Sequence, residues 1–281
     1  MTSEVSAGDD ATDDAPHRLE ALNLALVELE RRLRHFRLRQ LEFTGDLTLY
    51  GFLRGVWEHA SAARFLARDT DFGVAAYPCV RAAFEAAQDA LLLVTEPDYS
   101  EAGARARVFE RLEHADLKVE VFEAFAGDDD EEPPRDYSEA ARSIRADAGK
   151  WDKSCPCRGA LLVSALDQLQ PKFEAARAGK GRHPGHWSGM SRRKMAFLLG
   201  ERLGEPEFTK SLIATYAQLS RASHPRYRVE SWQKQATETG AKRYQRHPRE
   251  VLIVLGVARL AAETATMAFD RIKSKELPAS V

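Results

Sequence analysis

Cysteine is rare in this 281-residue chain, which contains three. A small, odd number of cysteines argues against the disulfide framework that stabilises many secreted proteins. No apolar run approaches the roughly 18 residues that a membrane-spanning helix needs. The N-terminal residues also lack the basic flank and apolar stretch of a signal peptide. These absences predict a cytoplasmic protein that does not bind membranes.

An excess of charge of one sign is missing as well. The formal net charge is -2 and the pI is near 6.5, so no global basic field indicates nucleic-acid binding, although a local basic groove is compatible with this total. The P-loop signature, the H-E-x-x-H pattern and the G-x-S-x-G elbow are all absent. The sequence therefore gives no sign of those three enzyme classes, and no cofactor is predicted.

Apolar residues recur at spacings of three and four along most of the chain, which indicates amphipathic helices. The first helix is expected from near His17, and a very apolar central helix from about Val74 to Glu96. A helix from about Asp46 to Arg68 would turn Phe65 inward. Further helices are expected at about 101–125, 137–149, 158–178, 191–201, 205–224 and 248–273. Because no segment is typical of a strand, the predicted fold class is an all-α helical bundle.

Composition also predicts the domain boundaries. Residues 1–16 are small, polar and acidic, which is typical of a disordered tail, and residues 274–281 are expected to form a second flexible tail. Residues 17–273 are predicted to form a single helical domain, in which residues 17–70 would form an N-terminal helical hairpin.

One polar row stands out near the C-terminal half. Tyr216, Ser220 and His224 are spaced by four, so they lie along one face of a helix. Pro225 disfavours helical geometry at the residue before it, so this helix should end at about His224. A histidine at a helix C-terminus is favoured in its protonated form, which suits a general acid or a phosphate contact. The alternative is that His224 only caps its helix.

A second polar pair lies on the apolar central helix. Arg81 and Glu85 have the i,i+4 spacing at which side chains pair. Charges on such a helix are costly unless they are compensated. The pair therefore either braces the core or orients the arginine toward a site.

The segment from Gly179 to Arg193 is basic and rich in glycine and histidine. His186 and Trp187, with the following Arg192 and Arg193, suit contact with a phosphate or nucleotide. The alternative is a solvated basic loop that Trp187 anchors. A second alternative is a zinc site made by four residues in two pairs, which are Cys155, Cys157, His183 and His186.

Three strings carry a family resemblance. They are YPCVRAAFEA (Tyr77 to Ala86), HWSGMSRRKMAFLLG (His186 to Gly200) and TYAQLSRASHP (Thr215 to Pro225). Together they resemble an uncharacterised bacterial helical family with an R-x-x-x-E helix, an H-W-x-G loop and a Y-x-x-x-S-x-x-x-H-P helix. That family looks related to the HEPN superfamily, which includes RNA-cleaving toxins and antiviral effectors. The resemblance covers roughly residues 45–272.

The resemblance implies a HEPN-like fold and one site in which seven residues converge: Arg81, Glu85, His186, Trp187, Tyr216, Ser220 and His224. HEPN ribonucleases work without a metal and use an arginine a few residues before a histidine, usually across a homodimer. Here Gln218 and Leu219 stand where that arginine is expected, so Arg81 would supply the charge from another helix.

The function implied by the resemblance is a metal-independent endoribonuclease of toxin or phage-defence type, with RNA or a nucleotide as partner and a homodimer as its state. The alternatives are a non-catalytic nucleotide-binding or regulatory module and a structural interaction protein.

Overall fold

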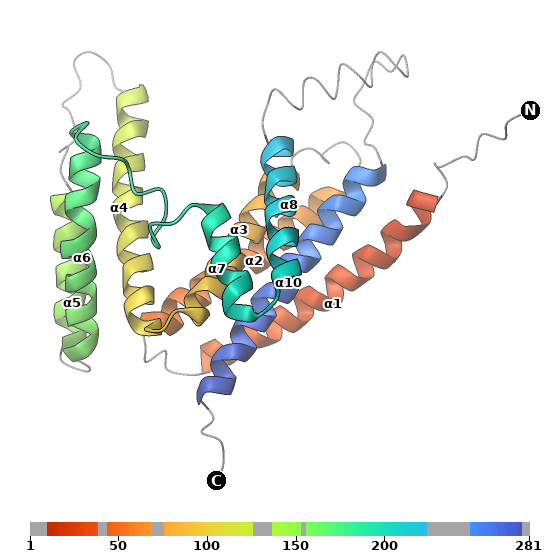
Figure 1. Cartoon of the computed structure of the whole chain (residues 1–281), viewed down its shortest axis with the longest axis horizontal. Coiled ribbons are helices and arrows are strands. Elements are labelled where there is room, and N and C mark those ends of the chain that lie inside the picture. The colour runs from red at the N-terminus through yellow and green to blue at the C-terminus, as the bar shows by residue number, and fades with distance from the viewer. Residues whose placement is uncertain are drawn as a thin grey trace, which may run out of the picture. The chain divides into compact units, whose positions relative to one another are not determined.

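The computed structural model describes residues 10–38, 44–68, 76–125, 137–152, 156–223 and 248–276. Every regular element in this part of the chain is an α-helix (Figure 1), which confirms the predicted all-α class. The helices are α1 (Asp10–Leu38), α2 (Thr44–Arg68), α3 (Ala76–Thr95), α4 (Tyr99–Phe125), α5 (Ser138–Asp152), α6 (Pro156–Arg177), α7 (Arg192–Leu203), α8 (Pro206–Ser223) and α10 (Pro248–Glu276).

Proline and glycine mark several of the helix ends. Helices α6, α8 and α10 begin at Pro156, Pro206 and Pro248, where the missing N–H costs no intrahelical bond. Gly179 and Gly204 follow α6 and α7 with φ angles of 67° and 70°. A left-handed residue at that position closes the last helical turn, and glycine adopts this conformation without a steric penalty.

The first and last helices of the chain are longer than the sequence predicted. Helix α1 begins at Asp10, inside the segment predicted as a disordered tail, and α10 extends to Glu276. Acidic residues are favoured in the first turns of a helix, since the macrodipole is positive there, and the sequence of residues 10–14 contains three aspartates. Residues 1–9 and 277–281 lie outside the described part.

Contacts within the chain gather in two compact units. The first unit consists of Met1–Gln40, Leu49–Thr95 and Ala196–Val281. The second unit consists of Leu41–Thr48 and Glu96–Met195. The single domain expected over residues 17–273 stays a prediction, and each unit is described by itself below.

Helices α1 and α2 of the first unit run antiparallel. Arg64 donates a hydrogen bond to Asn23 over 2.9 Å, and the rings of Phe36 and Tyr50 lie 5.9 Å apart at the other end of the pair. These two contacts give α1 and α2 opposite directions, whereas α1 packs extensively against α10. Helix α10 packs along α1. The two helices run parallel, as the contacts of Arg18 with the Leu252 carbonyl and of Arg32 with Asp270 show.

Helix α3 is the central helix of the first unit, as its apolar pattern predicted. Most of its residues are buried, and it packs against both α10 and α8. Helices α3 and α8 run antiparallel. Arg81 near the start of α3 contacts Tyr216 late in α8, whereas Thr95 at the end of α3 contacts Arg202, shortly before α8 begins. This register places the polar row of α8 toward the start of α3.

The expectation that Phe65 of α2 faces the core was wrong. Phe65 is 74% exposed. The buried stripe of α2 begins with Leu49, Leu53 and Val56 and continues through three alanines. Phe65 lies on the opposite side of the helix from this stripe, since residues 60, 63 and 67 hold the core positions at helical spacing.

The expectation that no segment could span a membrane was too strict. Among the described residues, Val251–Ile272 of α10 is long and apolar enough to cross a bilayer by length and composition. The buried side of this helix consists largely of alanines, and it packs against α1 and α3. Small side chains allow close helix contact, so the packing in the first unit accounts for the apolar composition.

Helices α4, α5 and α6 form the core of the second unit as an up-down-up bundle. Arg111 of α4 pairs with Asp147 of α5 over 2.5 Å, and Phe109 packs against Phe173 of α6. Tyr137, immediately before α5, is 2% exposed and also packs on Phe173. Tyr137 also contacts Asp116, and Arg145 pairs with Asp167, so α5 runs opposite to both α4 and α6.

A close approach between α7 and α8 gives a test of this packing. A Cβ added at Gly200 would collide with the hydroxyl of Thr209, which donates to the Ala196 carbonyl over 3.2 Å. Gly200→Ala should therefore reduce the free energy of unfolding by about 1–3 kcal/mol. Gly51→Ala is the control, because nothing lies within 4 Å of its added Cβ and alanine should stabilise that helix slightly. Equal stability of the two variants in urea unfolding would contradict the described α7–α8 contact.

Candidate functional site

The two polar rows expected from the sequence meet in the first unit at Arg81. The Nε of Arg81 donates to Oε1 of Glu85 over 2.8 Å. Its Nη2 donates to the hydroxyl of Tyr216 over 3.4 Å. The guanidinium carbon lies 5.5 Å from the centroid of the Tyr216 ring, a distance at which a cation is attracted to an aromatic face. We call these three residues the Arg81 cluster.

The Arg81 cluster is only partly shielded from solvent. The side chain of Arg81 is 31% exposed and that of Glu85 is 25% exposed. The hydrogen bond that Arg81 donates to Glu85 is the main cause that raises the pKa of Arg81 above its ordinary value, while partial burial opposes it. Arg81 therefore remains charged, and its guanidinium is held in one orientation by a carboxylate on its own helix and a phenol on α8.

The remaining members of the α8 row follow Tyr216 toward the helix end. Ser220 lies one turn further along α8 and is partly exposed. Helix α8 is described as far as Ser223, so the helix end predicted from Pro225 stays a prediction. His224 itself lies outside the described residues, so its place beside Arg81 stays a prediction.

His186 and Trp187 belong to the second unit, where both side chains are buried. They are 8% and 5% exposed, and their ring centroids lie 5.2 Å apart. The Nδ1 of His186 lies 2.7 Å from the Ser188 hydroxyl and accepts the Ser188 N–H over 3.1 Å. Gly189, with φ of 70°, completes this turn by donating to the His186 carbonyl. The burial of both rings favours the anchoring interpretation over direct contact with a nucleotide.

The other predicted ligand residues are distributed differently. Arg192 and Arg193 begin α7, and Arg193 is exposed. Cys155 and the side chain of Cys157 lie outside the description, and His183 contacts Asp116 over 3.0 Å. No group of three metal-ligating side chains occurs among the described residues. The convergence of His186 and Trp187 with the Arg81 cluster stays a prediction.

The comparisons with known proteins add no relative. No family model matches the chain. No curated protein and no solved structure matches it either. The HEPN-like resemblance therefore stays a prediction that depends on the three sequence strings.

A second polar cluster, which the sequence patterns did not indicate, lies at one end of the second unit. Asp116 of α4 accepts a short hydrogen bond from the hydroxyl of Tyr137. Its carboxylate also accepts from Arg177, at the end of α6, over 3.3 Å and lies 3.0 Å from Nε2 of His183. These four residues, which we call the Asp116 hub, come from four separate segments. The other three lie 21, 61 and 67 residues after Asp116, so no periodic signal reveals the hub.

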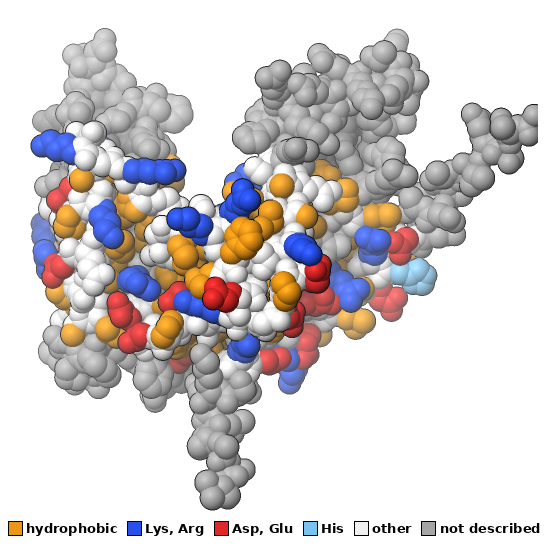
Figure 2. All heavy atoms as spheres, in the orientation of Figure 1, with side chains coloured by type: hydrophobic (Ala, Val, Ile, Leu, Met, Phe, Trp, Pro, Cys, Tyr) orange, Lys and Arg blue, Asp and Glu red, His pale blue; other side chains and the backbone are white. Residues whose placement is uncertain are grey.

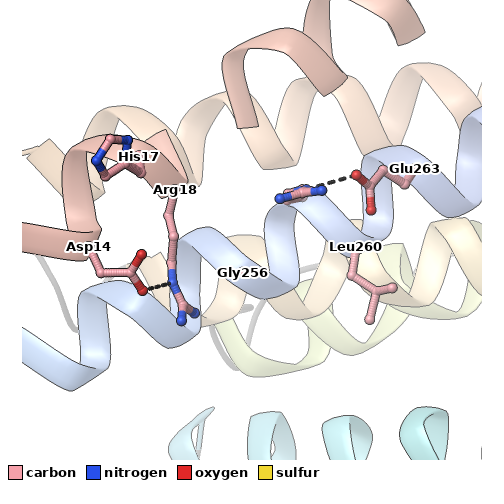
Figure 3. A pocket seen from close by; sticks show the side chains of 7 residues that line it. Asp14, His17, Arg18, Gly256, Leu260 and Glu263 are labelled. Atoms are coloured by element: carbon pink, nitrogen blue, oxygen red, sulfur yellow. Dashed lines mark hydrogen bonds and ion pairs between the residues drawn. The ribbon is translucent and has the colours of Figure 1, made fainter. Parts of the chain in front are cut away.

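A hollow of about 460 Å³ lies between α1 and α10 in the first unit (Figure 3). Its two arginines, Arg18 and Arg259, each pair with a carboxylate on the same helix, over 2.6 and 2.7 Å. Because the charges cancel within the hollow, it offers no excess positive charge for an anion. The Arg81 cluster is the stronger candidate, since its arginine is oriented by a tyrosine from another helix.

Removing the hub carboxylate should destabilise the second unit. Asp116→Ala leaves the buried Tyr137 hydroxyl and the Arg177 guanidinium without their shared acceptor, which should cost about 2–4 kcal/mol. Asp167→Ala is the matched control. Asp167 is 62% exposed and lies 3.7 Å from Arg145, so its loss should cost less than about 1 kcal/mol. Urea unfolding followed by circular dichroism measures both values, and equal costs would contradict the hub.

The hub also predicts a pH dependence at alkaline pH. Burial and the neighbouring Asp116 carboxylate raise the pKa of Tyr137 above its ordinary value. The unfolded chain should ionise this tyrosine near pH 10, before the folded chain does. The stabilisation is thus complete below about pH 10 and is lost as the pH rises further. Wild type should lose stability more steeply than Tyr137→Phe above that pH, and parallel slopes for the two proteins would contradict the assignment.

Proposed function

We propose that this chain is a HEPN-like, metal-independent endoribonuclease whose Arg81 cluster binds the scissile phosphate. The observation that carries the proposal is a permanently charged, partly exposed guanidinium held by Glu85 and Tyr216 on a largely apolar helix. A fixed guanidinium suits a phosphate because its planar N–H donors match the phosphate oxygens. Two of its donors are used by described residues, which leaves others for a ligand.

In the proposed reaction, the ribose 2′-oxygen attacks the adjacent phosphorus and the bond from phosphorus to the 5′-oxygen breaks. His224 acts as the acid or base, either accepting the 2′-hydroxyl proton or donating a proton to the leaving 5′-oxygen. Arg81 stabilises the negative charge of the phosphorane, and Glu85 keeps Arg81 in place. Tyr216 and Ser220 donate hydrogen bonds, and the products are a 2′,3′-cyclic phosphate and a 5′-hydroxyl. A toxin or phage-defence role and a homodimer belong to the same proposal.

A second function, nucleotide binding without turnover, is favoured by one specific observation. The described part of the cluster contains an arginine suited to an anion but no histidine to act as an acid or base. Binding of a mononucleotide without product formation would support this regulatory function. Thermal-shift and equilibrium-binding measurements with nucleotides distinguish it from cleavage.

Cleavage of RNA in the presence of EDTA tests the leading proposal. Purified protein should cut single-stranded RNA, and 2′-O-methyl RNA should stay intact because its nucleophile is blocked. Arg81→Ala should lower the rate by about 10²–10³-fold, as expected when a preorganised charge stabiliser is removed. His224→Ala should lower it by about 10²–10⁴-fold, as expected for a general acid or base.

Arg54→Ala provides a matched control on α2 of the same unit. Arg54 pairs with Glu58 at i,i+4 over 2.7 Å, like Arg81 with Glu85, but its side chain is 54% exposed. Its removal should leave the cleavage rate unchanged. RNA that stays intact with wild type, across varied sequences, would overturn the ribonuclease proposal. A loss of about 3–5 kcal/mol of stability in Arg81→Ala, with no change in activity, would instead indicate a structural brace.

A further inference from the structure

The second unit contains a stretch that departs sharply from the near-neutral charge of the whole chain. Residues 175–195, which we call the basic segment, contain six lysines and arginines and no acidic residue. The cations are Arg177, Lys180, Arg182, Arg192, Arg193 and Lys194. The formal charge of the whole chain is -2, so the positive charge of this segment is a local feature that the net charge conceals.

Contacts within the second unit fix the course of the basic segment. Arg177 and His183 are tied to Asp116 of α4. Further along, the buried Trp187 and the turn closed at Gly189 hold the chain before α7 begins. The segment is thus attached at several points, and its exposed cations project from a backbone with a defined course.

The cations between these attachment points, and those in the first turn of α7, face solvent. Lys180, Arg182, Arg193 and Lys194 are exposed. In the described part of the chain, Lys180, Arg182 and Lys194 form no ion pair with an acidic side chain. The Asp116 carboxylate, which does contact the segment, is already compensated by Arg177. Figure 2 shows Lys and Arg side chains at the end of the second unit where α6 ends.

The chemistry of this surface favours a phosphate backbone over a lipid surface. A membrane-binding surface combines basic residues with exposed apolar side chains that enter the bilayer. Within the basic segment no large apolar side chain is exposed and the tryptophan is buried, and one exposed aromatic, Phe197, follows it one turn along α7. A surface on which exposed cations outnumber exposed apolar groups binds nucleic acids through their phosphates, independently of base sequence.

We propose that the exposed cations of the basic segment, Lys180, Arg182, Arg193 and Lys194, form a binding surface for the phosphate backbone of single-stranded RNA. The choice of RNA rests on the proposed ribonuclease function, whereas the surface itself is separate from the residues assigned to cleavage. His186 and Trp187 act within it as anchors that fix the loop. The surface provides affinity that depends strongly on salt, and it does not select particular bases.

Fluorescence anisotropy with a short labelled 2′-O-methyl RNA tests this surface. The probe cannot be cut by attack of the 2′-oxygen, so its binding is measured whether or not the protein cleaves RNA. The triple variant Lys180→Glu, Arg182→Glu, Lys194→Glu should bind at least about 10-fold more weakly. The slope of log K against log salt should fall by about 2, as expected for the loss of three phosphate contacts to a single strand.

A matched triple variant on α5 separates a local effect from net charge. Arg142, Arg145 and Lys150 are exposed residues of the same unit, and their replacement by glutamate changes the total charge equally. The acidic run of residues 128–132, which lies outside the described residues, is identical in both variants. A difference in RNA affinity between the two variants therefore comes from the cations that were replaced.

The proposal predicts near wild-type affinity for the α5 variant and lost affinity for the basic-segment variant. Equal losses in both would overturn it. It would also be overturned if wild type bound phosphatidylserine vesicles but not RNA. If RNA binds through the basic segment while natural RNA stays uncut in EDTA, this surface stands and the ribonuclease proposal fails.

Discussion

The constraint on which the first unit depends is the burial of helix α3. A helix that is surrounded by protein along most of its length can hold an arginine only where a partner compensates the charge. Arg81 meets this condition through Glu85, one turn further along, and through Tyr216 of α8. The same contacts align α8 against α3, so the packing of two helices and the orientation of one guanidinium depend on each other.

A comparable constraint operates in the second unit, with the charges reversed. There, a largely buried carboxylate is compensated by donors that come from α6, from the start of α5 and from the loop that follows α6. Because Asp116 accepts from His183, the loop is held at the end of the bundle. The positive charges next to it therefore keep a defined position on the surface. In each unit, a polar cluster (the Arg81 cluster or the Asp116 hub) fixes the position of positive charges that face solvent.

The sequence predicted the parts of this structure that depend on local periodicity. The i,i+4 pairing of Arg81 with Glu85 follows from helix geometry, and it is present. The outward position of Phe65 was not predicted, because alanines at the buried positions of α2 carry little apolar signal. The burial of Trp187 agrees with the loop-anchor alternative, which the sequence left open beside contact with a nucleotide.

Contacts between segments far apart in the sequence could not be predicted from residue spacing. Asp116 and His183 are 67 residues apart, and only the antiparallel arrangement of α4 and α5, with α6 returning alongside α4, brings the hub residues together. The resemblance to an R-x-x-x-E and Y-x-x-x-S helix pair did anticipate that Arg81 and Tyr216 meet. It also grouped them with His186 and Trp187, two buried rings of the second unit.

The central claim is that the Arg81 guanidinium contacts an RNA phosphate. The most direct measurement is the ¹⁵N NMR signal of the Arg81 Nε–H group during titration with 2′-O-methyl RNA, assigned with Arg81→Lys. The account predicts that this signal shifts with RNA while that of Arg54 stays in place. An unchanged Arg81 signal in protein saturated with RNA would contradict the account.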